Sequence, residues 1–284
     1  MDQHGPLRGV GKTALGMALV RAQESRREDR LFDDPYAQAF ADAAAGAFSA
    51  EPAAAGEWTR GGPLARLGEV FAFHAAIRTR FFDDYLLGAA AAGCRQVVLL
   101  AAGLDSRAFR LPWPAGVRLF ELDLPDVIGF KETALARRDA KPACERTVIP
   151  ADLRGPWPAR LTAAGFERAA RTAWLAEGLL LYLTAGEAVG LLTDIGDLSA
   201  PGSQLSFEHG SIAGSALFTQ ARTLPGMAQY TALWKGGLGE DAPGWLARHG
   251  WQPQFHDRAR LAAAYGRPAP QASDGGFLTA VRTA

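Results

Sequence analysis

Short apolar runs that alternate with helical patterns are the feature that most constrains the fold of this chain. The runs are residues 96–101, 117–122, 147–149, 172–176 and 203–207, of which 147–149 is the weakest. Helical patterns at residues 126–138 and 185–198 separate some of them. Buried strands that alternate with helices are typical of parallel βαβ units. The sequence therefore predicts an α/β fold with a mostly parallel, doubly wound, Rossmann-like sheet.

The flanking segments extend this prediction in both directions. We expect a first helix at residues 13–27 and a second one that starts with Asp34 as N-cap and Pro35 at its first position. A loop at 49–63 and a long helix at 64–92 follow. A helix at 242–248 and strands at 251–255 and 276–282 are expected near the other end. We divide the chain into a helical N-terminal cap or lid segment, 1–92, and a core, 93–284, in which 210–235 is a substrate-side insertion.

Composition narrows the function classes. The chain has 284 residues, with 30 Lys and Arg against 30 Asp and Glu, so it lacks the basic excess of a typical nucleic-acid-binding protein. Two cysteines, Cys94 and Cys144, are too few for a disulfide framework, and no His/Cys/carboxylate cluster has metal-ligand spacing. No apolar run approaches the roughly 20 residues that cross a bilayer. We expect a cytoplasmic protein that binds no nucleic acid, membrane or metal.

Glycine and acidic residues follow four of the predicted strands. Gly103 lies in the turn after the first strand, Asp123 ends the second, Asp152 and Leu153 follow the third, and Glu177 follows the fourth. Open parallel sheets bind ligands at the carboxyl ends of their strands, where strand order reverses. Gly103 lets the backbone approach a ligand closely. Asp123 follows 20 residues later, a spacing that suits a carboxylate binding ribose hydroxyls.

Simpler interpretations exist for each of these positions taken alone. A glycine after a strand is often only a turn residue, and an aspartate there is often a helix N-cap, as Asp105 would be for a helix beginning near Ser106. Residues 9–13, GVGKT, look like a phosphate-binding loop, but the full pattern requires a glycine where Pro6 stands and a preceding strand. We therefore exclude nucleoside triphosphate binding there and treat the four strand ends as one set.

The set of strand ends favours one ligand chemistry. Acids at successive strand ends suit a ligand with hydroxyls, an exocyclic amine and a positive charge. A nicotinamide dinucleotide would require a GxGxxG pattern and a helix N-terminus for its phosphates, and the turn at 102–107 lacks that pattern. S-adenosylmethionine carries a ribose, an adenine amine, an ammonium, a carboxylate and a sulfonium, and no phosphate. It is the better match, with S-adenosylhomocysteine as its product.

Five sequence segments, in this order, resemble a known family. They are RAQESRREDRLFDDPYAQAF, IRTRFFDDYLL, QVVLLAAGLDSRAFRL, FELDLPDVIGFK and WLAEGLLLYL. The chain resembles the leucine carboxyl methyltransferase-like family, in its bacterial branch of class I S-adenosylmethionine-dependent methyltransferases. The resemblance covers residues 13–207 and, more loosely, the strand at 276–282. It implies the class I methyltransferase fold with a helical N-terminal extension.

The resemblance also implies roles for single residues toward the methyl donor. Arg78 would pair with the donor's carboxylate, Gly103 would lie against its amino-acid part, and Glu177 would lie near its ammonium. Asp123 matches the ribose-binding acid of the family. Asp152 and the backbone of Leu153 match its adenine-binding pair, and Arg21 matches a basic residue of the first helix.

Two histidines are candidates for a general base, should the reaction need one. A carboxylate acceptor is ionised at neutral pH and needs none, whereas a phenol or an alcohol does. His74 stands one helical turn before Arg78, and His209 follows the fifth predicted strand. Either histidine is equally well explained as a surface or packing residue, so both assignments depend on the acceptor.

The expected acceptor is a small molecule, aromatic or polyketide, whose carboxylate is O-methylated in secondary metabolism. Aromatic residues of the N-terminal helices and of 210–235 would line its pocket: Phe71, Phe73, Phe82, Phe218, Tyr230 and Trp234. Most are equally explained as core residues. The alternatives are methylation of a hydroxyl or a nitrogen, and a protein that binds the donor without catalysis. The sequence indicates no oligomeric state.

Overall fold

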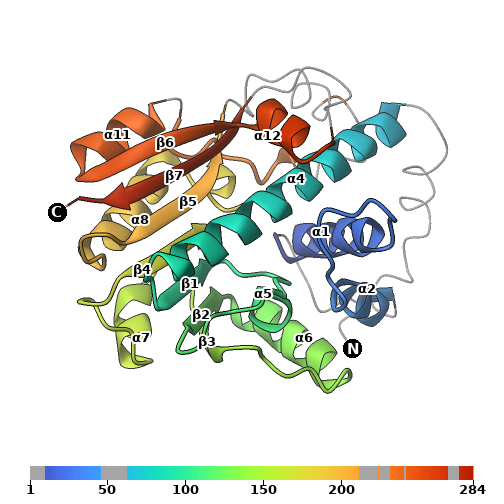
Figure 1. The fold of residues 1–284 in the computed structure, drawn as a ribbon, viewed down its shortest axis with the longest axis horizontal. Coiled ribbons are helices and arrows are strands. Elements are labelled where there is room, and N and C mark those ends of the chain that lie inside the picture. The colour runs from blue at the N-terminus through green and yellow to red at the C-terminus, as the bar shows by residue number, and fades with distance from the viewer. Residues whose placement is uncertain are drawn as a thin grey trace.

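The protein is built on one seven-stranded sheet (Figure 1). The computed structural model describes residues 10–45, 63–210, 223, 231–239, 241–267 and 275–283. The strands are β1 (Gln96–Leu100), β2 (Arg118–Asp123), β3 (Glu145–Pro150), β4 (Thr172–Ala176), β5 (Gln204–His209), β6 (Trp251–Asp257) and β7 (Gly276–Arg282). Their order is β3-β2-β1-β4-β5-β7-β6, in which β7 alone runs antiparallel to both of its neighbours. The predicted α/β, mostly parallel sheet is confirmed.

Helices cover both faces of this sheet. They are α1 (Val10–Ser25), α2 (Ala37–Ala45), α4 (Pro63–Ala91), α5 (Arg107–Arg110), α6 (Pro125–Ala136), α7 (Trp157–Ala163), α8 (Ala185–Asp197), α11 (Ala242–Arg248) and α12 (Arg258–Ala264). Side chains of β1 alternate between two cores, because successive residues of a strand point to opposite faces. Val97 and Leu99 join the core with α4 and α6, whereas Val98 and Leu100 join the core with α7, α8 and α11.

Helix α4 connects the N-terminal segment to the sheet. It crosses one face of the sheet diagonally (Figure 1), and its Phe81, Phe82 and Leu86 belong to the same buried core as Val97 of β1. Phe81 stacks on Phe277 of β7, with ring centroids 4.4 Å apart. Residues before and after position 92 therefore belong to one hydrophobic core. The division of the chain into two parts at residue 92 stays a prediction.

Several boundaries differ from expectation for local reasons. Asp34 acts as the predicted N-cap, because its carboxylate accepts from the backbone N–H groups of Tyr36 and Ala37. The regular helix α2 begins at Ala37, two residues beyond the predicted start at Pro35. Strand β3 is twice the predicted length, while helices α7 and α12 were not anticipated. The loop predicted at 49–63 and most of the insertion at 210–235 lie outside the described residues. No helix among the residues described is long and apolar enough to span a membrane.

Candidate functional site

The turn after β1 brings Gly103 against Asp123. Gly103 has φ +51°, in the left-handed region that favours glycine, and a Cβ added there would lie 3.3 Å from the Cβ of Ala14 in α1. Its backbone N–H donates to Oδ2 of Asp123 at 2.5 Å, and the N–H of Leu124 donates to Oδ1 at 2.6 Å. Burial raises the pKa of Asp123 although these two N–H groups oppose it. A carboxylate at the end of β2 thus lies directly beside the glycine turn.

Arg21 reaches the same turn from helix α1. Its Nη2 donates to the carbonyl of Leu104 at 2.6 Å, and its Nε donates to Asp34 Oδ2 at 2.8 Å. The bond to Leu104 joins residues 83 positions apart in the chain. Helix α1 is therefore fastened to the turn that contains Gly103, so Arg21 lies at the strand-end site even though its own guanidinium is occupied by protein groups.

Arg78 of α4 lies between two carboxylates at the ends of β4 and β5. Its Nε is 2.9 Å from Glu177 Oε1, and its Nη1 donates to Glu208 Oε1 at 2.9 Å. Burial raises the pKa of Glu177, but the positive charges of Arg107 and Arg78 outweigh burial and leave that pKa below its ordinary value. The structure therefore brings together Arg78 and Glu177, two residues 99 positions apart whose proximity was only implied by resemblance.

The adenine-binding pair predicted after β3 lies next to the Asp123 strand end. Strands β2 and β3 pair with Asp123 opposite Pro150, and the N–H of Ala151 donates to the carbonyl of Asp123 at 2.8 Å. Asp152 is exposed and paired with Arg154 at 2.5 Å, which lowers its pKa chiefly through that hydrogen bond. Leu153 is half-buried against the core on the α7 side. Both residues thus follow the carboxyl end of a parallel strand, at the same end of the sheet as Gly103.

The two candidate histidines have different surroundings. His74 lies on α4, its Nε2 is buried without a hydrogen-bond partner, and burial together with the charges of Arg258 and Arg78 lowers its pKa to about 3. A histidine with that pKa is a weak proton acceptor. His209 ends β5 and meets the ring of Phe255 edge-on at 5.9 Å. The lowered pKa argues against His74 as a base, while His209 stays a candidate by its position at the carboxyl end of β5.

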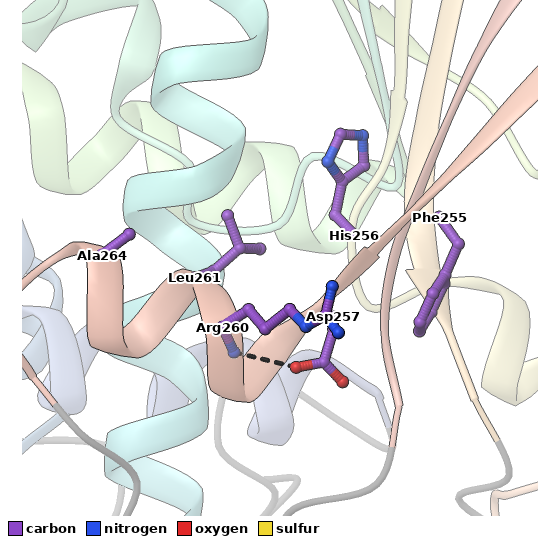
Figure 2. Close-up of a pocket in the computed structure, with 6 residues that line it drawn as sticks. All are labelled: Phe255, His256, Asp257, Arg260, Leu261 and Ala264. Atoms are coloured by element: carbon purple, nitrogen blue, oxygen red, sulfur yellow. Dashed lines mark hydrogen bonds between the residues drawn. The ribbon is translucent and has the colours of Figure 1, made fainter.

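A cavity of about 620 Å³ opens between the end of β6 and α12. It lies at the same end of the sheet as the carboxyl ends of the parallel strands. Strands β5, β7 and β6 meet there, since His209 pairs with Gly276 and Gly276 pairs with Asp257. Figure 2 shows the residues that line it, with Asp257 accepting from the backbone N–H of Arg260 at 2.8 Å. The lining combines Phe255 and Leu261 with charged groups, so it suits an amphipathic molecule.

The predicted aromatic walls are only partly visible. Phe82 is fully buried in the core, so it lines no pocket, and Phe71 and Phe73 are half-buried on α4. Trp234 is half-buried near the end of the insertion, while Phe218 and Tyr230 lie outside the described residues.

Comparison with known proteins decides the family. Residues 14–196 match the family model described as leucine carboxyl methyltransferase. The chain belongs to this family. A relative from Frankia alni, named as a candidate S-adenosyl-L-methionine-dependent methyltransferase, is 55% identical over 275 residues, covering 96% of this chain and 95% of the relative. One from Streptomyces coelicolor with the same kind of name is 46% identical, and 96% of each chain is covered.

Solved structures agree with the class of fold. A candidate methyltransferase from Thermobifida fusca superposes with a TM-score of 0.52, at 18% identity, over 94% of this chain and 95% of that one. At this identity the likeness shows the fold alone, which is that of class I methyltransferases. As a member of the leucine carboxyl methyltransferase family, the chain is an S-adenosylmethionine-dependent methyltransferase, and the predicted class, enzyme type and cofactor are confirmed.

The residues at the strand ends fit this donor chemically. A left-handed glycine lies beside a half-buried carboxylate at Asp123, and a cation at Arg78 lies beside a carboxylate at Glu177. These groups complement a ribose, a carboxylate and an ammonium, and no described helix N-terminus with a phosphate-binding glycine pattern is among them. Within the described part of the chain, no group of three or more His, Cys, Asp or Glu is arranged to hold a metal ion.

Sequence reasoning missed a buried ion network behind this site of the leucine carboxyl methyltransferase fold. Arg107 is 3% exposed and pairs with Asp83 of α4 at 2.6 Å, with Glu177 at 2.6 Å, and with Asp105. Arg110 also pairs with Asp83, at 2.6 Å. Asp105 does not cap α5, whose N-cap is Ser106, but accepts from the backbone and side chain of Arg107. The network joins α4, α5 and the ends of β1 and β4.

Proposed function

We propose that these strand ends form the donor site of an O-methyltransferase that esterifies the carboxylate of a small molecule. The observation that carries the proposal is the Gly103–Asp123 hydrogen bond together with the Arg78–Glu177 pair, at the carboxyl ends of the strands around β1 and β4, the neighbours between which strand order reverses. In an open α/β sheet this reversal is the point at which ligands bind. The bound donor supplies an electrophilic methyl group, and the protein positions the acceptor and excludes water.

Each strand-end residue then has one task. Arg78 holds a carboxylate through its forked donors, Glu177 attracts an ammonium, and Asp123 accepts from ribose hydroxyls. Asp152 and the backbone of Leu153 contact the adenine. Arg21 keeps helix α1 over the glycine turn through its bond to Leu104.

The acceptor is expected to be a carboxylate because the described site offers little basic catalysis. The pKa of His74, about 3, leaves it a poor base, and a carboxylate is already ionised at neutral pH. The half-buried Phe71 and Phe73 on α4 favour an aromatic or polyketide acceptor of secondary metabolism. The net charge of zero favours a small molecule over nucleic acid, and the free thiols of Cys94 and Cys144 fit a reducing cytoplasm. His209 supports a second candidate, methylation of a hydroxyl or a nitrogen.

Calorimetric titration with S-adenosylhomocysteine, with NAD as the negative ligand, tests the donor site. Asp123→Asn removes the carboxylate charge at the glycine turn, and we expect binding about 10- to 100-fold weaker, as for a lost hydrogen bond to a charged group. Asp126→Asn is the matched control, because Asp126 is exposed on α6. Equal affinity for both variants would contradict the assignment. Methyl transfer to aromatic carboxylates but not to matched phenols would then support the acceptor class.

A further inference from the structure

Glu208 is a half-buried carboxylate at the end of β5 that no family motif singled out. Its Oε1 accepts from Arg78 Nη1 at 2.9 Å, and the backbone N–H of Gly178 lies 3.0 Å from Oε1 and 2.8 Å from Oε2. Gly178 has φ +63°, and a Cβ added there would lie 3.6 Å from Arg78 Nη1. One guanidinium and one backbone N–H thus hold a single carboxylate, which is the donor set that a ligand carboxylate requires.

Glu177 and Glu208 depend on Arg78 to different degrees. Glu177 has a second cation, since its Oε2 accepts from Arg107 Nη1 at 2.6 Å. Its contact with Arg78 Nε, at 2.9 Å, lacks hydrogen-bond geometry, so the attraction is electrostatic only. Glu208, in contrast, accepts a hydrogen bond from Arg78. Glu208 is therefore the carboxylate that competes directly for the guanidinium Nη1 of Arg78.

We propose that Glu208 occupies the position of the donor's carboxylate on Arg78 and Gly178 in the donor-free protein, and leaves both groups when the donor binds. The inference rests on the donor site proposed above, in which Arg78 binds that carboxylate. A donor carboxylate that took Arg78 Nη1 and the Gly178 N–H would displace Glu208 from both, so binding exchanges an internal anion for an external one. The internal anion keeps Arg78 paired and correctly placed before the donor arrives.

The exchange changes the protonation of Glu208. The charged groups that face it are Arg78 from α4, Glu177 after β4 and Arg258 at the start of α12. Burial and the charge of Glu177 raise the pKa of Glu208, whereas Arg78 and the N–H of Gly178 lower it. When Glu208 leaves Arg78 and Gly178, both lowering contributions are lost. A Glu208 carboxyl group that stays desolvated after the exchange therefore has its pKa raised further.

Two ligands that differ in their carboxylate test the proposal. S-adenosylhomocysteine carries the amino-acid part, and 5′-methylthioadenosine lacks it. Glu208→Gln keeps the side-chain shape but removes the competing charge, so we expect S-adenosylhomocysteine to bind about tenfold more tightly than to wild type. Binding of 5′-methylthioadenosine should not change. Weaker or equal binding of S-adenosylhomocysteine by Glu208→Gln would overturn the proposal and show that Glu208 only positions Arg78.

Proton uptake gives an independent readout. The enthalpy of S-adenosylhomocysteine binding, measured at several pH values in buffers of different ionisation enthalpy, should show proton uptake by wild type that is absent in Glu208→Gln. Glu145→Gln, an exposed acid on β3, is the matched control and should behave as wild type. Binding without proton uptake by wild type would overturn the exchange. Wild type that is folded but binds neither adenosine ligand would instead refute the donor site itself.

Discussion

The local environment of His74 determines whether this residue can act as a base, a role that its position in the sequence alone suggested. The residue stands one turn before Arg78, a spacing that placed it near the donor site, and the structure confirms that Arg78 lies close enough to influence it. Burial and the nearby positive charges nevertheless lower its pKa to about 3. The imidazole is therefore neutral at physiological pH and accepts protons weakly. A spacing rule can place a histidine, but it does not report the charges that the fold gathers around it.

We predict that His74→Gln leaves the shape of the pH profile of kcat unchanged between about pH 5 and 8. The wild-type imidazole does not titrate in that range, because its pKa of about 3 lies below it. Initial rates on a carboxylate acceptor across this range measure the profile. A limb near pH 6.5 that His74→Gln abolishes would show that His74 titrates as an ordinary histidine.

Glu208 is a candidate site residue that was not predicted from the sequence. The rule that singled out Glu177, an acid at the carboxyl end of a strand, applies equally to Glu208 at the end of β5. The residue predicted at this strand end is its neighbour His209, because the side chain of a histidine can serve as a base. Arg107 and Asp83 carry no comparable signal in the sequence, since each is one charged residue among many. Their pairing depends on the fold, which brings Asp83 of α4 to the arginines of α5.

Helix α4 presents two adjacent aspartates to different environments. Asp83 is 4% exposed and accepts hydrogen bonds from both Arg107 and Arg110. Asp84 pairs with Arg80 on the solvent side, at 2.9 Å, with both side chains close to half-exposed. Neighbouring residues on a helix point about 100° apart, which explains how one faces the sheet and the other faces water. The pair is an internal comparison of a buried and an exposed ion pair.

Asp83→Asn should lower the free energy of unfolding by about 3 to 5 kcal/mol, because it leaves two buried arginines without their shared counterion. Asp84→Asn should lower it by only about 0.5 kcal/mol, as expected for an exposed pair. Urea unfolding of both variants and wild type, followed by circular dichroism, measures the difference. Equal effects of the two substitutions would mean that the network joining α4 to α5 contributes no more than a surface ion pair.

Prediction of whole elements succeeded where burial is complete on both faces. Strands β1 and β4 are buried at every residue, and their apolar runs identified them within about one residue. Strand β3 lies at the edge of the sheet with only Ile149 fully buried, so its sequence gave a weak, shortened signal. Helix α12 was missed although alanine and arginine favour helices, because its seven residues carry one large apolar side chain, Leu261, and so show no helical period. Its start depends on the Asp257 N-cap, which accepts from the backbone N–H of Arg260.

Two acids at the carboxyl ends of the strands, Asp105 and Glu177, are held in their charged form by nearby cations. Burial raises the pKa of Asp105, but the charges of Arg107 and Lys131 outweigh it and lower that pKa to about 2. The pKa of Glu177 is lowered in the same manner, by Arg107 and Arg78. A folded-state pKa below the unfolded value contributes stability above the unfolded pKa, and this contribution is lost as pH falls through the folded pKa.

We therefore predict that Asp105→Asn is less stable than wild type at pH 7 and that the difference shrinks as pH falls from about 4 to about 2. Urea unfolding at a series of pH values in this range and at pH 7 follows the difference. Asp126→Asn, on the exposed side of α6, should track wild type throughout. A difference that stays constant over the whole range would show that Asp105 contributes through packing and not through its charge.

The place of β7 between β5 and β6 has a consequence for the order of folding. Strand β6 precedes β7 in the chain but contacts the sheet only through it, because the order is β5-β7-β6. Hence β6 cannot join before β7 has paired with β5, and that pairing closes a long loop from His209 to Gly276. Loop closure of this kind slows folding. We expect the cavity beside β6 to form last, after the donor-binding half of the sheet has already assembled.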